Sequence, residues 1–149
     1  MFVWLHPYAK TERAYALCNT LMPYFLSAAV LGLSVGLVWG MLFAPSDYQQ
    51  GDSFRIIYIH VPSAILSMGT YVAMAIAGLV GLVWQWKTAY MSMIAMAPVG
   101  ALMCFISLFT GAAWGKPMWG TWWIWDARLT SQLILLFLYF GVMALYYAF

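Results

Sequence analysis

LMPYFLSAAVLGLSVGLVWGMLF, at Leu21–Phe43, carries no charged side chain along its whole length. An α-helix needs about 20 consecutive apolar residues to cross the hydrocarbon core of a bilayer, so this stretch is long enough to span a membrane. Three further uncharged runs follow it, at Ile56–Trp86, Met91–Ala113 and Leu129–Phe149. All the charged residues lie outside these four runs, as expected of segments that face lipid.

The composition of the whole chain excludes other classes of protein. Of its 149 residues, 66% are hydrophobic and only 7% are charged, whereas soluble proteins average about 25% charged residues. This hydrophobicity also excludes a disordered chain, and a net charge of +2 is too small for a nucleic-acid-binding surface. We therefore predict an all-α integral membrane protein, in which residues 1–149 form a single membrane domain with a bundle of four transmembrane helices in contact with lipid.

Four spans place the two longer connections, residues 44–55 and 114–128, on the same side of the membrane. The N-terminus and residues 87–90 then lie on the other side. Lysine and arginine are equally numerous on the two sides, but Lys10 and Arg13 precede the first helix, which usually dominates the orientation. We expect the N-terminus inside and the two longer connections outside.

His60 is expected at the membrane surface on the side of these longer connections. If Trp86 marks one interface, His60 lies about 39 Å away along a helix, at the opposite interface. Pro62 agrees with this placement, because proline suits the first turn of a helix.

The connection after the third run, Trp114–Arg128, is unusually rich in tryptophan. Five of the nine tryptophans of the chain lie in it: Trp114, Trp119, Trp122, Trp123 and Trp125. An aromatic belt at the membrane interface would be spread over all the helix ends. Exposing so much aromatic surface to water costs about 25 cal/mol per Å². The concentration of tryptophan therefore predicts a surface that covers a large, flat, apolar ligand.

Two backbone conformations of this connection remain open. On a helix, Trp119, Trp122, Trp123 and Asp126 form one stripe, whereas on an extended chain Trp119, Trp123 and Trp125 share a face. Both conformations give an aromatic platform edged by the Asp126 carboxylate.

Basic residues on the same side complete a pattern that fits haem. Tryptophan faces would cover the macrocycle, Arg55 and Arg128 would pair with its carboxylates, and the His60 imidazole would bind the iron. We therefore predict a b-type haem with His60 as the metal ligand. Taken singly, each residue also fits a plainer role: His60 as an interfacial histidine, the arginines as helix-end anchors and Asp126 as a helix cap.

The segment Trp119-Gly120-x-x-Trp123-x-Trp125-Asp126 resembles the WGxxWxWD signature of the WWD family of haem-handling proteins in cytochrome c biogenesis. Ala44–Gly51 and Tyr58–Pro62 resemble the CcmC branch of that family, and the resemblance covers essentially the whole chain. It implies a bacterial inner-membrane protein whose periplasmic Trp-rich loop holds haem. It also implies partners, namely the transporter subunits CcmA and CcmB, the small protein CcmD, and the chaperone CcmE that receives the haem.

By this resemblance His60 is an axial ligand, and Arg55 and Arg128 are propionate partners. The matched motif positions are Trp119, Trp123, Trp125 and Asp126, with Trp114 and Trp122 flanking them. The chain has no phosphate-binding Walker A loop, so we expect a haem-binding and transport subunit rather than an enzyme.

The family has six spans and a second external histidine, whereas this chain has four apolar runs and its other histidine, His6, lies on the opposite side. We therefore expect an N-terminal portion of a longer protein. Two other functions remain open: a membrane electron-transfer subunit carrying b-type haem, and a structural transporter subunit whose Trp-rich loop docks a protein.

Overall fold

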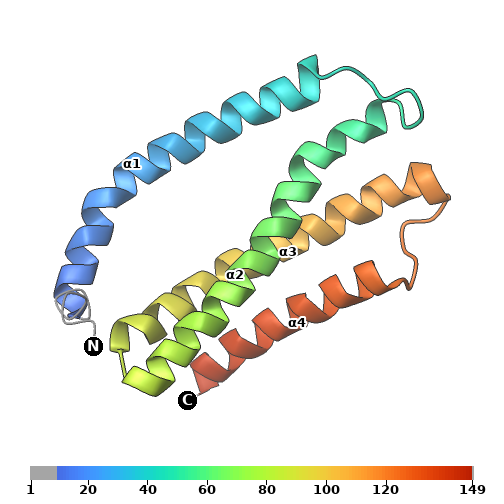
Figure 1. Ribbon diagram of the computed structural model, residues 1–149. Coiled ribbons are helices and arrows are strands. Elements are labelled where there is room, and N and C mark those ends of the chain that lie inside the picture. The colour runs from blue at the N-terminus through green and yellow to red at the C-terminus, as the bar shows by residue number, and fades with distance from the viewer. Residues whose placement is uncertain (1–9, 149) are drawn as a thin grey trace.

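The computed structural model describes residues 10–148, and this part of the chain folds into helices without a strand (Figure 1). The long helices are α1 (Thr11–Val38), α2 (Ile57–Trp84), α3 (Lys87–Trp119) and α4 (Ala127–Ala148). A π-helical turn, η2 (Trp39–Phe43), extends α1, and a 3-10 helix, η3 (Asp52–Ile56), leads into α2. All four long helices are long and apolar enough to cross a membrane, which confirms the predicted all-α membrane fold.

Two helices extend beyond the apolar runs that predicted them. The first helix begins at Thr11 rather than Leu21, and the third continues through Trp114 to Trp119. The apolar runs mark only the part of each helix that suits contact with lipid. The helix itself continues until a residue interrupts the backbone hydrogen bonding. Gly120, with a φ of 76°, ends α3 in the left-handed region that glycine adopts easily. The connection to α4 is therefore residues 120–126 rather than 114–128.

Helices α2, α3 and α4 pack together, whereas α1 lies apart along most of its length (Figure 1). No residue of α1 is buried, but α3 buries a series of small residues that includes Ala97, Gly100 and Ala101. Small residues let helix backbones approach closely within a membrane. The two longer connections lie at one end of the molecule, and the turn between α2 and α3 lies at the other (Figure 1).

Polar contacts fix α4 against α2. The Tyr139 hydroxyl donates to the Ser67 carbonyl oxygen at 2.6 Å, and the Gln132 amide donates to Ser67 Oγ at 2.8 Å. Tyr139 is completely buried and packs over Gly100, where an added Cβ would collide with its ring. These contacts set the position of the N-terminal end of α4, from which Arg128 extends.

The connection between α1 and α2 is held at both of its ends. Arg55 donates from Nε to the Ala44 carbonyl and from Nη1 to the Met41 carbonyl, each at 3.2 Å. The Trp114 indole Nε1 donates to Gln50 Oε1 at 3.0 Å. The first pair of contacts satisfies carbonyl groups at the end of η2, and the second ties the connection to α3.

Candidate functional site

His60 lies in the first turn of α2, in agreement with its predicted place near the start of this helix. The start of α2 is at the end of the molecule where the longer connections lie (Figure 1). Its Nδ1 is 3.0 Å from the Ser107 carbonyl oxygen and 3.1 Å from Thr110 Oγ1. A carbonyl oxygen only accepts hydrogen bonds, so these contacts assign the ring proton to Nδ1. In the neutral imidazole, Nε2 then carries the lone pair that a metal ion would use.

A cavity of about 360 Å³ lies beside His60, between α2, α3 and α4. Four of the residues predicted from the sequence line it, namely His60, Trp114, Trp119 and Arg128. Ser107 and Gln132 add polar groups to walls that are otherwise mainly apolar. A mostly apolar cavity with a few convergent polar groups is the usual form of a ligand site.

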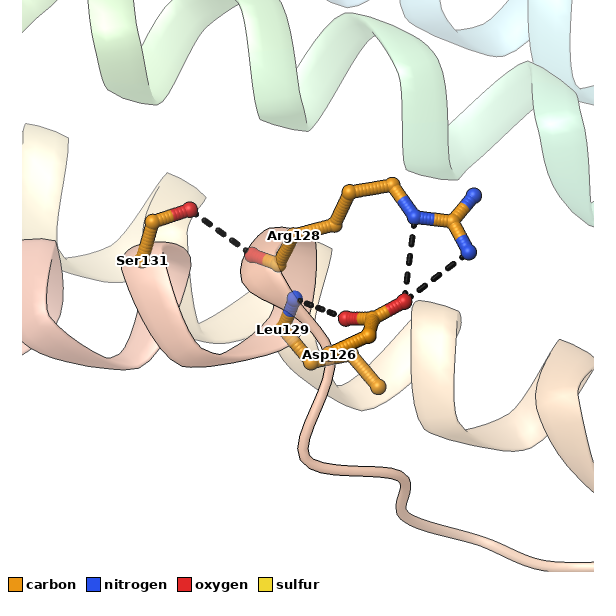
Figure 2. Close-up of polar contacts among 4 residues, drawn as sticks. All are labelled: Asp126, Arg128, Leu129 and Ser131. Atoms are coloured by element: carbon orange, nitrogen blue, oxygen red, sulfur yellow. Dashed lines mark hydrogen bonds and ion pairs between the residues drawn. The ribbon is translucent and has the colours of Figure 1, made fainter.

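Asp126 and Arg128 form a compact ion pair at the start of α4 (Figure 2). Arg128 donates from Nε and Nη2 to Asp126 Oδ2 at 3.1 and 2.9 Å. The Leu129 backbone N–H donates to Asp126 Oδ1 at 2.8 Å, which confirms the helix-cap interpretation of Asp126. This hydrogen bond from Leu129, assisted by the Arg128 contacts, lowers the pKa of the Asp126 carboxyl.

Arg128 also contacts the aromatic wall of the cavity. Its guanidinium carbon lies 5.5 Å from the centre of the Trp119 ring, within the range of a cation–π interaction. The Ser131 hydroxyl donates to the Arg128 carbonyl oxygen at 3.0 Å, in the first turn of α4 (Figure 2). Arg128 is therefore held in place by a carboxylate and an indole while its side chain remains 77% exposed.

Four of the five tryptophans of this segment form two edge-to-face pairs rather than one platform. Trp114 and Trp119, in the last turns of α3, have ring centres 5.1 Å apart. Trp123 and Trp125, in the connection, have ring centres 5.3 Å apart. Because residues 120–126 are not helical, the helical stripe that was one of the two open conformations does not form.

Several predicted site residues lie outside the His60 cavity. Trp122 and Trp125 are 58% and 75% exposed, and Trp123 packs against the core of the bundle. Arg55 lines a second cavity of about 370 Å³, which shares Trp114 with the first. The indole Nε1 of Trp123 is buried and has no hydrogen-bond partner among the described residues, which leaves a donor available to an acceptor.

Ser107, Thr110 and Gln132 were not singled out from the sequence as site residues. The available signal was the presence of polar side chains inside otherwise apolar spans, where such groups are costly and are often functional. His6, expected on the opposite side of the membrane, lies outside the described residues.

Comparison with known proteins places the chain in a family. The family model for CcmC, heme exporter protein C, matches residues 4–149. The heme exporter protein C of Haemophilus influenzae is 64% identical over all 149 residues, and that of Escherichia coli K12 is 59% identical over the same span. That of Bradyrhizobium diazoefficiens is 49% identical over 140 residues, or 94% of this chain and 53% of the relative.

The alignments to the first two relatives cover all of this chain but 61% of each relative. The chain therefore spans about three-fifths of the length of these relatives. The family model and these identities agree along nearly the whole sequence, so the chain belongs to the heme exporter protein C family.

Proposed function

We propose that this chain binds haem at the periplasmic surface of the bacterial inner membrane, with His60 as an axial ligand, and presents it for transfer to the chaperone CcmE. The observation that carries this proposal is the set of contacts made by the His60 ring. Its Nδ1 is engaged by Ser107 and Thr110, and its ring lines a cavity together with Trp114 and Trp119. One imidazole nitrogen suits haem, because the porphyrin supplies the in-plane ligands of the iron and leaves an axial position to the protein.

The size of the cavity favours partial rather than complete enclosure of haem. Its volume of about 360 Å³ is near the lower end of ligand pockets, which range over roughly 300–1,000 Å³. We propose that one edge of the macrocycle enters beside Trp114 and Trp119 while the opposite edge stays accessible. Partial exposure suits a protein that hands its cargo to another protein.

Of the two arginines, Arg128 is the better candidate to bind a haem propionate. Arg55 directs Nε and Nη1 to backbone carbonyls and Nη2 to Asp52 at 3.4 Å, so all three of its nitrogens have partners. Arg128 lines the His60 cavity, and its two contacts with Asp126 use only Nε and Nη2. We propose that Nη1 of Arg128 donates to a propionate.

The exposed tryptophans suggest a separate role in protein contact. Trp122 and Trp125 lie outside the cavity, and exposed aromatic side chains are enriched at protein interfaces. We propose that they face CcmE or another subunit of a complex with CcmA, CcmB and CcmD, in which a partner subunit hydrolyses ATP.

The proposal predicts that His60→Ala lowers the haem content of the purified, detergent-solubilised protein severalfold and alters its absorption spectrum. A pyridine haemochrome assay after haem is supplied measures the content. His6→Ala is the matched control, because it removes the only other histidine of the chain, and it should retain haem. Equal haem contents in the His60→Ala variant and the wild type would contradict the proposal.

A second pair of variants distinguishes haem binding from protein docking. Trp119→Ala, in the cavity wall, should lower haem content, whereas Trp39→Ala, an exposed tryptophan in η2, should not. If the Trp-rich segment serves only to dock a partner protein, the haem content of the Trp119→Ala variant will match that of the wild type.

A further inference from the structure

We propose that Thr110 is a positioning residue for His60, which selects the ring tautomer that leaves Nε2 free to ligate haem iron. This inference rests on the proposed function. Thr110 Oγ1 lies 3.1 Å from His60 Nδ1, across the interface between α3 and α2. Thr110 is buried in the third helix and is 50 positions away from His60 in the sequence.

The hydrogen bonds of Thr110 determine what its hydroxyl offers to His60. Thr110 Oγ1 lies 2.7 Å from the Ile106 carbonyl oxygen and 3.2 Å from the Ser107 carbonyl oxygen, and the hydroxyl donates its single proton to these backbone acceptors. The oxygen lone pairs then remain to accept a hydrogen bond from His60 Nδ1–H. With the Ser107 carbonyl at 3.0 Å, Nδ1 faces two acceptors. The opposite tautomer would place the Nδ1 lone pair against the Ser107 carbonyl oxygen, and Thr110 could donate to Nδ1 only by giving up its hydrogen bond to the Ile106 carbonyl.

One turn of α3 therefore forms the surface against which the His60 imidazole packs. Ser107, Thr110 and Gly111 lie at positions i, i+3 and i+4 of this helix and so share one face. At Gly111 an added Cβ would lie 3.1 Å from His60 Cε1, so the ring packs closely over the helix at this point. Such contacts to the non-ligating nitrogen orient metal-binding histidines and raise the basicity of the ligating nitrogen.

The test observes the ring nitrogens directly in the haem-free protein. Because the chain has two histidines, His6→Gln leaves His60 as the single site of ¹⁵N-histidine labelling. Spectra are recorded at about pH 9, where a histidine side chain in water is neutral. Nε2 is recognised by two-bond couplings to both ring hydrogens, since Nδ1 is two bonds from only one of them. The nitrogen shifts then report which nitrogen carries the proton.

We expect the wild-type background to show a protonated Nδ1 and an unprotonated Nε2, the opposite of the tautomer preferred by histidine in water. Thr110→Val should lower the ratio of this tautomer to the other by about 2- to 10-fold, the effect of losing one neutral hydrogen bond. Thr110→Ser retains the hydroxyl and should restore the ratio. Thr110→Ala provides a second variant without the hydroxyl if valine disturbs folding.

A protonated Nε2 in the wild-type background would overturn the proposal before any variant is made. An unchanged tautomer ratio in Thr110→Val and Thr110→Ala would overturn the role of Thr110. In the haem-loaded protein, the iron–histidine stretching band in the resonance Raman spectrum should shift in Thr110→Val and return in Thr110→Ser. Failure to bind haem, with the expected tautomer intact, would instead reject the proposed function, so the two failures are distinguishable.

Discussion

At the scale of single residues, Asp126 shows how one carboxylate supports both a helix and the edge of the site. Its Oδ1 accepts the Leu129 backbone N–H, and its Oδ2 accepts two donors of Arg128 (Figure 2). The first contact begins α4, and the second holds the guanidinium near Trp119. Asp126 therefore both begins α4 and positions the Arg128 side chain.

The lowered pKa of Asp126 predicts a pH dependence of stability. A carboxyl whose pKa is lower in the folded state stabilises that state above its unfolded pKa, which is about 3.8. This contribution decreases as the pH falls below that value and is lost as the pH passes the lower, folded pKa. We expect the thermal midpoint of the detergent-solubilised protein, followed by circular dichroism, to fall over this range.

The variant Asp126→Asn isolates this contribution. Asparagine caps helices well but does not ionise, so the variant should lose the part of the acid dependence that comes from residue 126. Asp126→Ala should lower the midpoint at neutral pH by a few degrees, because it removes the cap as well. Identical acid dependence in the wild type and Asp126→Asn would show that another carboxyl is responsible.

At the scale of elements, the end of α3 controls where the tryptophans point. Helix α3 passes through Trp114 and Trp119, which brings their rings together, and it ends at Gly120. The Lys116 ammonium donates to the Gly120 carbonyl oxygen at 3.0 Å and closes the last turn. The chain then changes direction and reaches the cap of α4 at Asp126.

Gly120→Ala should therefore destabilise the protein by about 1–2 kcal/mol, because an L-residue is strained at a φ of 76°. Gly141→Ala, in the middle of α4 with no atom within 4 Å of the added Cβ, is the control and should be neutral or slightly stabilising. Thermal unfolding of both variants in detergent measures the difference. Equal midpoints would contradict the role of Gly120 in ending α3.

At the scale of the whole molecule, the site depends on the packing of three helices. His60 belongs to α2, its hydrogen-bond partners to α3, and Arg128 to α4, so each helix supplies one part. The contact of Tyr139 with Gly100 and Ser67 links all three helices below the cavity. In contrast, α1 contributes no buried residue to this arrangement.

Gly100→Ala tests this packing, because the added Cβ would collide with the Tyr139 ring and force α4 away from α3. Overpacking of this kind typically costs about 1–3 kcal/mol, and it should also weaken haem binding if α4 carries Arg128 outward. Gly69→Ala, in α2 with open space around the added Cβ, is the control. The thermal midpoint and the haem content of both variants give the result. A Gly100→Ala variant with the midpoint of the wild type would contradict the proposed contact.

The sequence by itself determined the four membrane-spanning helices. The length of an apolar run is a local property of the sequence, and it can be compared directly with the thickness of the bilayer. It also indicated that His60 lies near the start of its helix and that Asp126 caps one, since capping preferences act within a single turn. The expectation that Pro62 lies in the first turn was wrong, because α2 already begins at Ile57 and Pro62 lies inside the helix. The predicted start of the first helix and the predicted end of the third were wrong. An apolar run shows which residues suit contact with lipid, whereas the ends of a helix depend on where its backbone hydrogen bonding stops.

Only the tertiary structure decided which residues meet at His60. Ser107 and Thr110 are 47 and 50 positions from His60 in the sequence, and they reach its ring because α2 and α3 pack side by side. The packing of α4 against these two helices adds Arg128 to the cavity that Trp114 and Trp119 line. Trp122, Trp125 and Arg55 are left outside this cavity. Periodicity assigns a residue to a helix face, but side-chain packing between helices determines which faces come together.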